Sequence, residues 1–216
     1  MNVTNTTDKF LPAMPAAVSG ALLLASTPAF AHHAMGGATP QTLVQGLLSG
    51  LAHPVIGLDH LAFLVVAMLL ACALKGTARF LVPLVFVGAT LGGTAMHVGA
   101  ANIPLSETLV AMSVIIAGVL ALTRRNPGAL ALSVIFAASG ILHGYAYGES
   151  IVGAETTPLL AYLAGFAAIQ YGIIAGGVLA LDKLAAHSES SRALASSVGS
   201  LAALLTGGLF FALSFA

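Results

Sequence analysis

Long apolar stretches, separated by short turns, constrain the fold of this chain more than any other feature. Of its 216 residues, 58% are hydrophobic and only 6% are charged, and the mean hydropathy is +1.01. Soluble domains carry roughly a quarter charged residues, so lipid is the solvent that suits this surface. Stretches close to 20 apolar residues predict membrane-spanning helices. We therefore expect an all-α, polytopic membrane protein.

The first part of the chain is typical of a secretory signal. The stretch Ala16–Phe30 is apolar but too short to span a bilayer, and it ends in an A-x-A-like cleavage site. We expect a cleaved signal peptide over residues 1–31 and a single transmembrane helical domain over 32–216. An uncleaved amphipathic or signal-anchor helix is the alternative. Cleavage would leave His32 and His33 at the new amino terminus, where they are possible accessory metal ligands.

About six spans follow the signal sequence. The first is expected to be broken at His53–Pro54, because proline lacks the N–H that a helix interior needs. Hydropathy and turn residues place the spans at 41–74, 80–101, 105–123, 129–147, 158–181 and 193–215, with a soluble stretch between the last two.

The basic residues indicate an orientation. After the signal sequence they occur in alternate loops only, at Lys75, Arg79, Arg124, Arg125, Lys183 and Arg192. The loops at 102–106 and 148–157 contain no Lys or Arg, and by the positive-inside rule they face outward. We expect a bacterial inner-membrane protein with both mature termini outside. A net charge of zero without a basic run argues against nucleic acid as a partner. The sequence does not indicate the oligomeric state.

On this topology, costly ionisable residues from several spans meet at the outer membrane level. Ionisable groups inside a bilayer are expensive and commonly mark ion paths, and imidazole and carboxylate are ligands that divalent transition metals accept. The candidate metal ligands are His53, Asp59, His60, His97, His143 and Glu149, with Glu107 as a possible accessory ligand.

Two of these histidines need a bend to meet. His53 and His60 are two helical turns apart, which is about 10 Å of rise on a straight helix and too far for one ion. Pro54 and Gly57 lie between them and can bend or unwind the turn. Broken helices recur at transporter substrate sites. Asp59 can ligate a metal or orient an imidazole.

Small residues flank His97 and His143 at helical spacing, which allows neighbouring helices to approach closely. Glu149 either reaches back to the site or is a solvated acid. Glu107 can ligate a metal or stabilise the start of its helix. The tyrosines near this level suit an interfacial aromatic belt; they are Tyr145, Tyr147 and Tyr162.

The segment His53–His60, HPVIGLDH, resembles the HPxxGxDH signature of the HupE/UreJ family, and His143–Glu149 is similar to a second family motif, HGYAHGxE. Tyr147 replaces the second histidine of that motif, which leaves the metal preference open. The resemblance implies about six spans after a signal sequence and a nickel or cobalt permease of the kind associated with hydrogenase and urease gene clusters. It implies functional roles for His53, Asp59, His60, His143 and Glu149.

The sequence therefore favours a permease, not an enzyme, that captures a divalent metal ion from the periplasm. Nickel or cobalt is favoured as cargo, zinc or iron is possible, and no permanent cofactor is expected. No Walker A motif is present, so the membrane potential or a partner would drive uptake. The alternatives are a metal sensor or chaperone without transport, a haem-binding electron carrier using His60, His97 and His143, and a hydrolase using Ser113 or Ser139.

Overall fold

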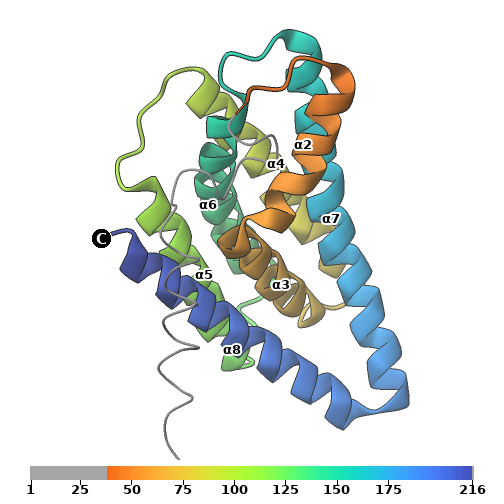
Figure 1. Cartoon of the computed structure of the whole chain (residues 1–216). Helices are drawn as coiled ribbons and strands as arrows, with labels where there is room; N and C mark the ends of the chain where they lie inside the picture. Colours follow the sequence, from red (N-terminus) through yellow and green to blue (C-terminus); the bar gives the residue numbers. More distant parts are fainter. Residues whose placement is uncertain (1–37, 216) are drawn as a thin grey trace, which may run out of the picture. The chain divides into compact units, whose positions relative to one another are not determined.

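The computed structural model describes residues 38–215, and every regular element in that range is helical (Figure 1). The elements are α2 (Leu43–Ile56), α3 (Leu58–Cys72), α4 (Ala78–Val98), α5 (Ser106–Leu122), α6 (Ala129–Gly148), the short 3₁₀ turn η1 (Glu149–Ile151), α7 (Thr156–His187) and α8 (Glu189–Leu213). The all-α expectation is confirmed for this part of the chain. The expected signal peptide, residues 1–31, lies outside the described residues.

The helices have the length and composition of membrane spans. Among the described residues, α4, α6 with η1, α7 and α8 qualify individually, and α2 and α3 qualify together as one bent pair. The helix α5 is apolar but has only 17 residues, about 26 Å of rise. The structure thus supports a multi-pass membrane protein with four or five clear spans, and each of the six expected stretches is helical.

The break in the first span lies at Gly57 and not at His53–Pro54. The helix α2 continues through Pro54 to Ile56, and α3 leaves it at 75°. The backbone of Gly57 serves both helices, since its N–H donates to the His53 carbonyl at 3.1 Å and its carbonyl accepts from Leu61 at 2.8 Å. Pro54 costs one helical hydrogen bond, but Gly57 is where the chain turns.

Glycines allow two helix pairs to touch through their backbones. On α4 and α6, a Cβ at Gly93 would collide with the Ile141 carbonyl and one at Gly144 with the Thr90 carbonyl. On α2 and α7, a Cβ at Gly50 would collide with the Tyr162 carbonyl. The close approach expected beside His143 is therefore present, as is typical of membrane helices.

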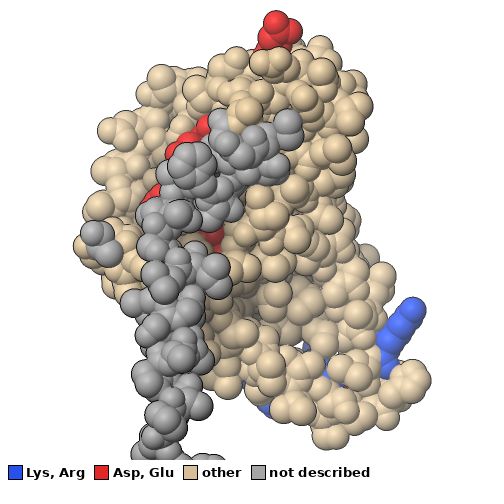
Figure 2. Space-filling view, in the orientation of Figure 1, with Lys and Arg blue, Asp and Glu red and all other residues tan. Residues whose placement is uncertain are grey.

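Three inter-helix contacts gather the basic loops at one end of the helices, here called the basic end. Arg79 pairs with Asp182 at 2.8 Å. The guanidinium of Arg124 lies 3.3 Å from the Ser197 hydroxyl, and Asn126 donates to the Ala73 carbonyl at 2.7 Å. The visible Lys and Arg side chains lie in the lower part of Figure 2 and the visible Asp and Glu above them.

The stretch after residue 181, expected to be soluble, is helical. The helix α7 runs on to His187, and only Ser188 separates it from α8. Ser188 caps α8 by accepting the Ser191 N–H at 3.2 Å. The helix of the fifth span thus continues beyond its apolar part.

Candidate functional site

Three buried histidines from three helices meet inside the helical bundle. His53 on α2, His60 on α3 and His143 on α6 are 2%, 1% and 0% exposed, and we call them the histidine trio. The ring centroids of His60 and His143 are 4.9 Å apart, and those of His53 and His60 are 5.8 Å apart. The bend at Gly57 makes this possible, since a straight helix would separate His53 and His60 by about 10 Å.

Gly57 is required by this geometry. A Cβ at position 57 would lie 2.7 Å from Cδ2 of the His60 ring and 3.4 Å from the His53 carbonyl oxygen. The first of these contacts is shorter than packed atoms adopt, so the glycine makes room for the His60 imidazole. The same residue therefore turns the helix and seats the ring.

The hydrogen bonds determine which nitrogen of His143 and His60 carries a proton. The Ser113 hydroxyl donates to the Val110 carbonyl at 2.7 Å, so it accepts from Nε2–H of His143 at 2.9 Å. Neutral imidazole has one donor and one acceptor nitrogen, and Nδ1 of His143 is therefore the acceptor. It accepts Nδ1–H of His60 at 2.8 Å, which leaves the lone pair of His60 on Nε2.

A second network orients His53. The Tyr162 hydroxyl donates to the Tyr147 carbonyl at 2.9 Å and so accepts from Nδ1–H of His53, also at 2.9 Å. The Ser150 hydroxyl lies 2.9 Å from the same nitrogen. The lone pair of His53 is consequently on Nε2, as in His60. With Nδ1 of each ring hydrogen-bonded, Nε2 is the nitrogen that His53 and His60 can offer to a transition metal.

Tyr147 lies between the two networks. Its ring is 5.0 Å from that of His53 and 4.4 Å from that of His60, and it is fully buried. Its hydroxyl has no hydrogen-bond partner within the described part of the chain. A buried hydroxyl in that state costs about 1–3 kcal/mol. Tyr147 therefore brings to the histidine trio a buried hydroxyl that lacks a hydrogen-bond partner among the described residues.

The acidic candidates differ in burial. Asp59 is 6% exposed, and its Oδ1 accepts the backbone N–H of His60 at 2.9 Å in the first turn of α3. Glu149 and Glu107 are exposed, and Glu107 lies in the first turn of α5, where the helix dipole favours an acid. Only Asp59 is thus buried beside the histidine trio.

His97 is half-buried on α4 and has different neighbours. Its ring lies 4.4 Å from that of Tyr145, and its Cβ faces Gly148. Its Nδ1 is buried and has no hydrogen-bond partner within residues 38–215. Over residues 38–215, no three His, Cys, Asp or Glu side chains are arranged to hold an ion together. The expected six-residue ligand set is thus divided between the histidine trio with Asp59 and the outlying His97 and Glu149. His32 and His33 lie outside the described residues.

Three phenylalanines, Phe63, Phe86 and Phe136, separate the histidine trio from the basic end, and we call them the aromatic layer. All are fully buried, with Phe63 stacked on Phe86 at 4.8 Å and Phe136 within 6.3 Å of both. Phe63 lies 4.5 Å from the His143 ring. On α3, α4 and α6 alike, the phenylalanine lies nearer the basic end than the histidine of the same helix does. The aromatic layer therefore closes the histidine trio on the side that faces the basic end.

Sequence reasoning missed several residues of this region. Tyr147 and Tyr162 are fully buried and Tyr145 is 8% exposed, so these tyrosines do not form an interfacial belt. Gln170 is also fully buried, donates to the Phe166 carbonyl at 3.0 Å, and leaves its Oε1 without a partner among the described residues. A search restricted to ionisable residues passes over Gln170, although a glutamine within an apolar span is itself a signal.

The helices and the buried histidine trio define a multi-pass membrane protein with a polar site inside an apolar bundle. The model of the family described as HupE / UreJ protein matches residues 20–209, and the chain belongs to this family. It is 27% identical over 151 residues to "Protein HupE" of Rhizobium leguminosarum bv. viciae, an alignment covering 70% of this chain and 75% of that protein. No solved structure shows significant similarity.

Proposed function

We propose that this protein is an inner-membrane permease for a divalent transition-metal ion, with nickel or cobalt favoured and zinc or iron as other possible cargo. The observation that carries the proposal is the histidine trio, in which three helices bury neutral imidazoles beside the Asp59 carboxylate. Family membership supports it, because HupE/UreJ proteins are transporter-type membrane proteins, generally related to nickel and cobalt transport.

The ligands would be Nε2 of His53 and His60, with Asp59 as the charged partner. Their Nδ1 atoms are occupied as donors, so the tautomers already suit metal binding. Side-chain rotation is needed to aim these groups at one ion, since they do not converge as they stand. His97, His143 and Glu149 remain further candidates, with Glu107, His32 and His33 as possible accessory ligands.

The ion would enter from the end opposite the basic end. The positive-inside rule assigns that end to the periplasm, and both mature termini with it. Passage toward the cytoplasm requires the aromatic layer to move. Thr90 lies one helical turn from Phe86 on α4, and its hydroxyl is 3.4 Å from Nε2 of the buried Gln170. The membrane potential can drive the ion without ATP, at about 2.3 kcal/mol per charge per 100 mV.

A sensor or chaperone that binds without transport is the second candidate, because the aromatic layer closes the histidine trio toward the basic end. The geometry favours neither haem nor acyl transfer. The ring of His60 packs against Tyr147 and His143, where an axial ligand would face a porphyrin. The Ser113 hydroxyl accepts from His143 and donates to a carbonyl, which is the reverse of an activated nucleophile.

Uptake of radioactive nickel and cobalt into proteoliposomes tests the proposal. We expect His60→Ala to lower uptake at least tenfold, because it removes one ligand and breaks the hydrogen bond to His143. The matched control is His187→Ala, since His187 is exposed and its Nδ1 bonds the Lys183 carbonyl in its own helix at 2.8 Å. Wild-type binding without uptake would favour the sensor. No uptake of any divalent metal above empty vesicles would overturn the permease.

A further inference from the structure

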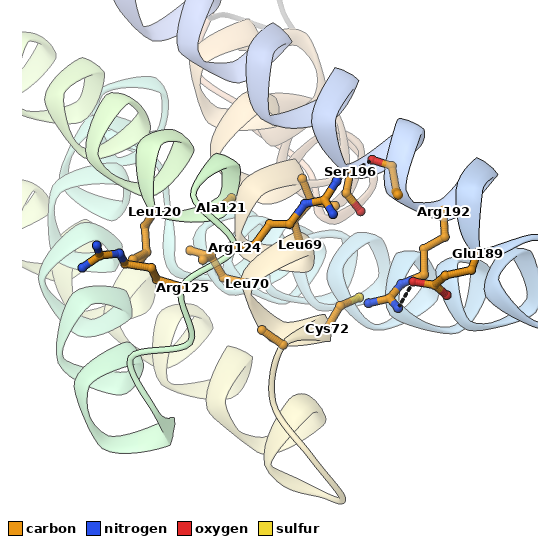
Figure 3. Close-up of a pocket in the computed structure, with 12 residues that line it drawn as sticks. Leu69, Leu70, Cys72, Leu120, Ala121, Arg124, Arg125, Glu189, Arg192 and Ser196 are labelled. Carbon is orange, nitrogen blue, oxygen red and sulfur yellow. Dashed lines mark hydrogen bonds and ion pairs between the residues drawn. The ribbon is translucent and has the colours of Figure 1, made fainter.

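A cavity of about 180 Å³ opens at the basic end, where α3, α5 and α8 meet (Figure 3). Its wall toward the membrane interior is apolar and includes Leu69, Leu70 and Leu120. Its mouth carries Arg124 and Arg192, and Arg125 lies at the rim with its side chain directed away from α8. The cavity is therefore amphipathic, with an apolar interior and a cationic entrance.

The positive charge at the mouth is only partly compensated. Arg192 pairs with Glu189 at 3.0 Å, and among the described residues Glu189 is the only acid that lines the cavity. The guanidinium of Arg124 reaches two neutral oxygens on α8, the Ser197 hydroxyl at 3.3 Å and the Ala193 carbonyl at 3.5 Å. An anion at the mouth would thus meet the Arg124 guanidinium, which no acid neutralises, beside the paired Arg192. Guanidinium groups bind phosphate through paired N–H donors.

The backbone of Arg124 is a separate observation about the same place. This residue follows the end of α5 with a φ of 53°, the left-handed region that favours glycine. An arginine there carries backbone strain, and such strain clusters at ligand clamps. It holds the guanidinium across the gap between α5 and α8 (Figure 3).

We propose that this cavity binds an anionic phospholipid, with its phosphate between Arg124 and Arg192 and an acyl chain along Leu69, Leu70 and Leu120. The cavity lies at the ends of α3 and α5, where the apolar helices meet the headgroup level. Basic pockets between membrane helices on the side of the basic loops bind such headgroups. The lipid would join three helices that are otherwise linked at this end by few polar contacts.

The test is native mass spectrometry of the purified full-length chain, with phosphatidylglycerol or cardiolipin against phosphatidylcholine. We expect the wild type to retain anionic lipid preferentially. Arg124→Gln with Arg192→Gln should weaken retention roughly tenfold or more. The control is Lys75→Gln with Lys183→Gln, two exposed residues of the same end that do not line the cavity, which should retain lipid as the wild type does.

Two further arms decide the source of the phosphate and guard against misfolding. Inorganic phosphate added in excess should not displace the lipid, and displacement would show a site for soluble phosphate instead. The helical circular dichroism of each variant is compared with that of the wild type. The proposal would be overturned if the wild type retained phosphatidylcholine as well as it retains anionic lipid. Equal losses of anionic lipid in the two double variants would overturn it too. The wild-type comparison does not depend on the folding of any variant.

Discussion

The hydroxyl groups of Tyr147 and Tyr162 lie in the same buried region but have opposite surroundings. The Tyr162 hydroxyl contacts His53, Ser150 and the Tyr147 carbonyl within 3.0 Å. The Tyr147 hydroxyl has no such partner among the described residues. Burial removes both hydroxyl groups from water, and of the two only the Tyr162 hydroxyl forms hydrogen bonds with other described residues instead. The two residues therefore form a matched pair for separating structural from functional roles.

We expect Tyr162→Phe to lower the free energy of unfolding by about 1–3 kcal/mol, because it leaves buried polar groups of His53 and Tyr147 with fewer partners. Tyr147→Phe removes no hydrogen bond and should leave stability unchanged or slightly higher. Thermal unfolding in detergent, followed by circular dichroism, measures both. A loss in Tyr147→Phe as large as in Tyr162→Phe would contradict the assignment of an unsatisfied hydroxyl.

Sequence reasoning reached the members of the histidine trio but not their immediate neighbours. His53, His60 and His143 stand out because ionisable residues are rare in apolar helices. Tyr147, Tyr162 and Gln170 are compatible with either lipid or protein surroundings, and hydropathy alone does not say which face of a helix is covered. The sequence also does not show that Glu149 is exposed, because its exposure depends on where α6 ends and η1 begins.

At the scale of elements, the contact between α4 and α6 positions His143. These helices approach so closely that Gly93 faces backbone atoms of α6, while its neighbour Gly92 has nothing within 4 Å of a Cβ position. Two adjacent glycines on one helix thus have different functions. Gly93 permits the approach, and Gly92 lies on an open face.

Gly93→Ala and Gly92→Ala test this difference. An alanine at position 93 would collide with the Ile141 carbonyl and lie 2.7 Å from the Tyr145 nitrogen, so we expect a loss of about 1–3 kcal/mol in stability. At position 92 the change should be neutral or stabilising by up to about 1 kcal/mol, the helix propensity of alanine over glycine. Apparent melting temperatures compare the two. Equal melting temperatures would argue against backbone contact between α4 and α6.

The positions of the spans were predictable because hydropathy and loop charge determine them, but the break in the first span was misplaced. Proline disrupts a helix by removing one donor, yet Pro54 remains helical because the turns on either side keep their bonds. The chain turns at Gly57, where the His60 ring excludes any side chain. That constraint comes from a tertiary contact, and local sequence signals do not contain it.

At the scale of the whole molecule, the gathered basic loops support one orientation of the bundle. Contacts among Arg79, Asp182, Arg124 and Ser197 bring the loops together at one end. In a bacterial inner membrane such an end faces the cytoplasm. The C-terminal end of α8 lies away from it, since Ser214 accepts a hydrogen bond from Thr108 at the start of α5.

We therefore expect a C-terminal alkaline phosphatase fusion to be active and a C-terminal green fluorescent protein fusion to be dark, because the first folds only in the periplasm and the second only in the cytoplasm. A fusion after Arg125, between α5 and α6, is the internal control and should show the opposite pattern. Fluorescence at the C-terminus with an inactive phosphatase would reverse the orientation and place the histidine trio nearer the cytoplasm.

The series of hydrogen bonds from His60 through His143 to Ser113 has a consequence for energy coupling. It ends at the Val110 carbonyl, which accepts a hydrogen bond but carries no proton to pass on. The series therefore cannot work as a proton wire, and an ion arriving at His60 would not be exchanged for protons along it. Uptake without a counter-ion would be electrogenic, with each divalent ion carrying two charges and gaining about 4.6 kcal/mol per 100 mV.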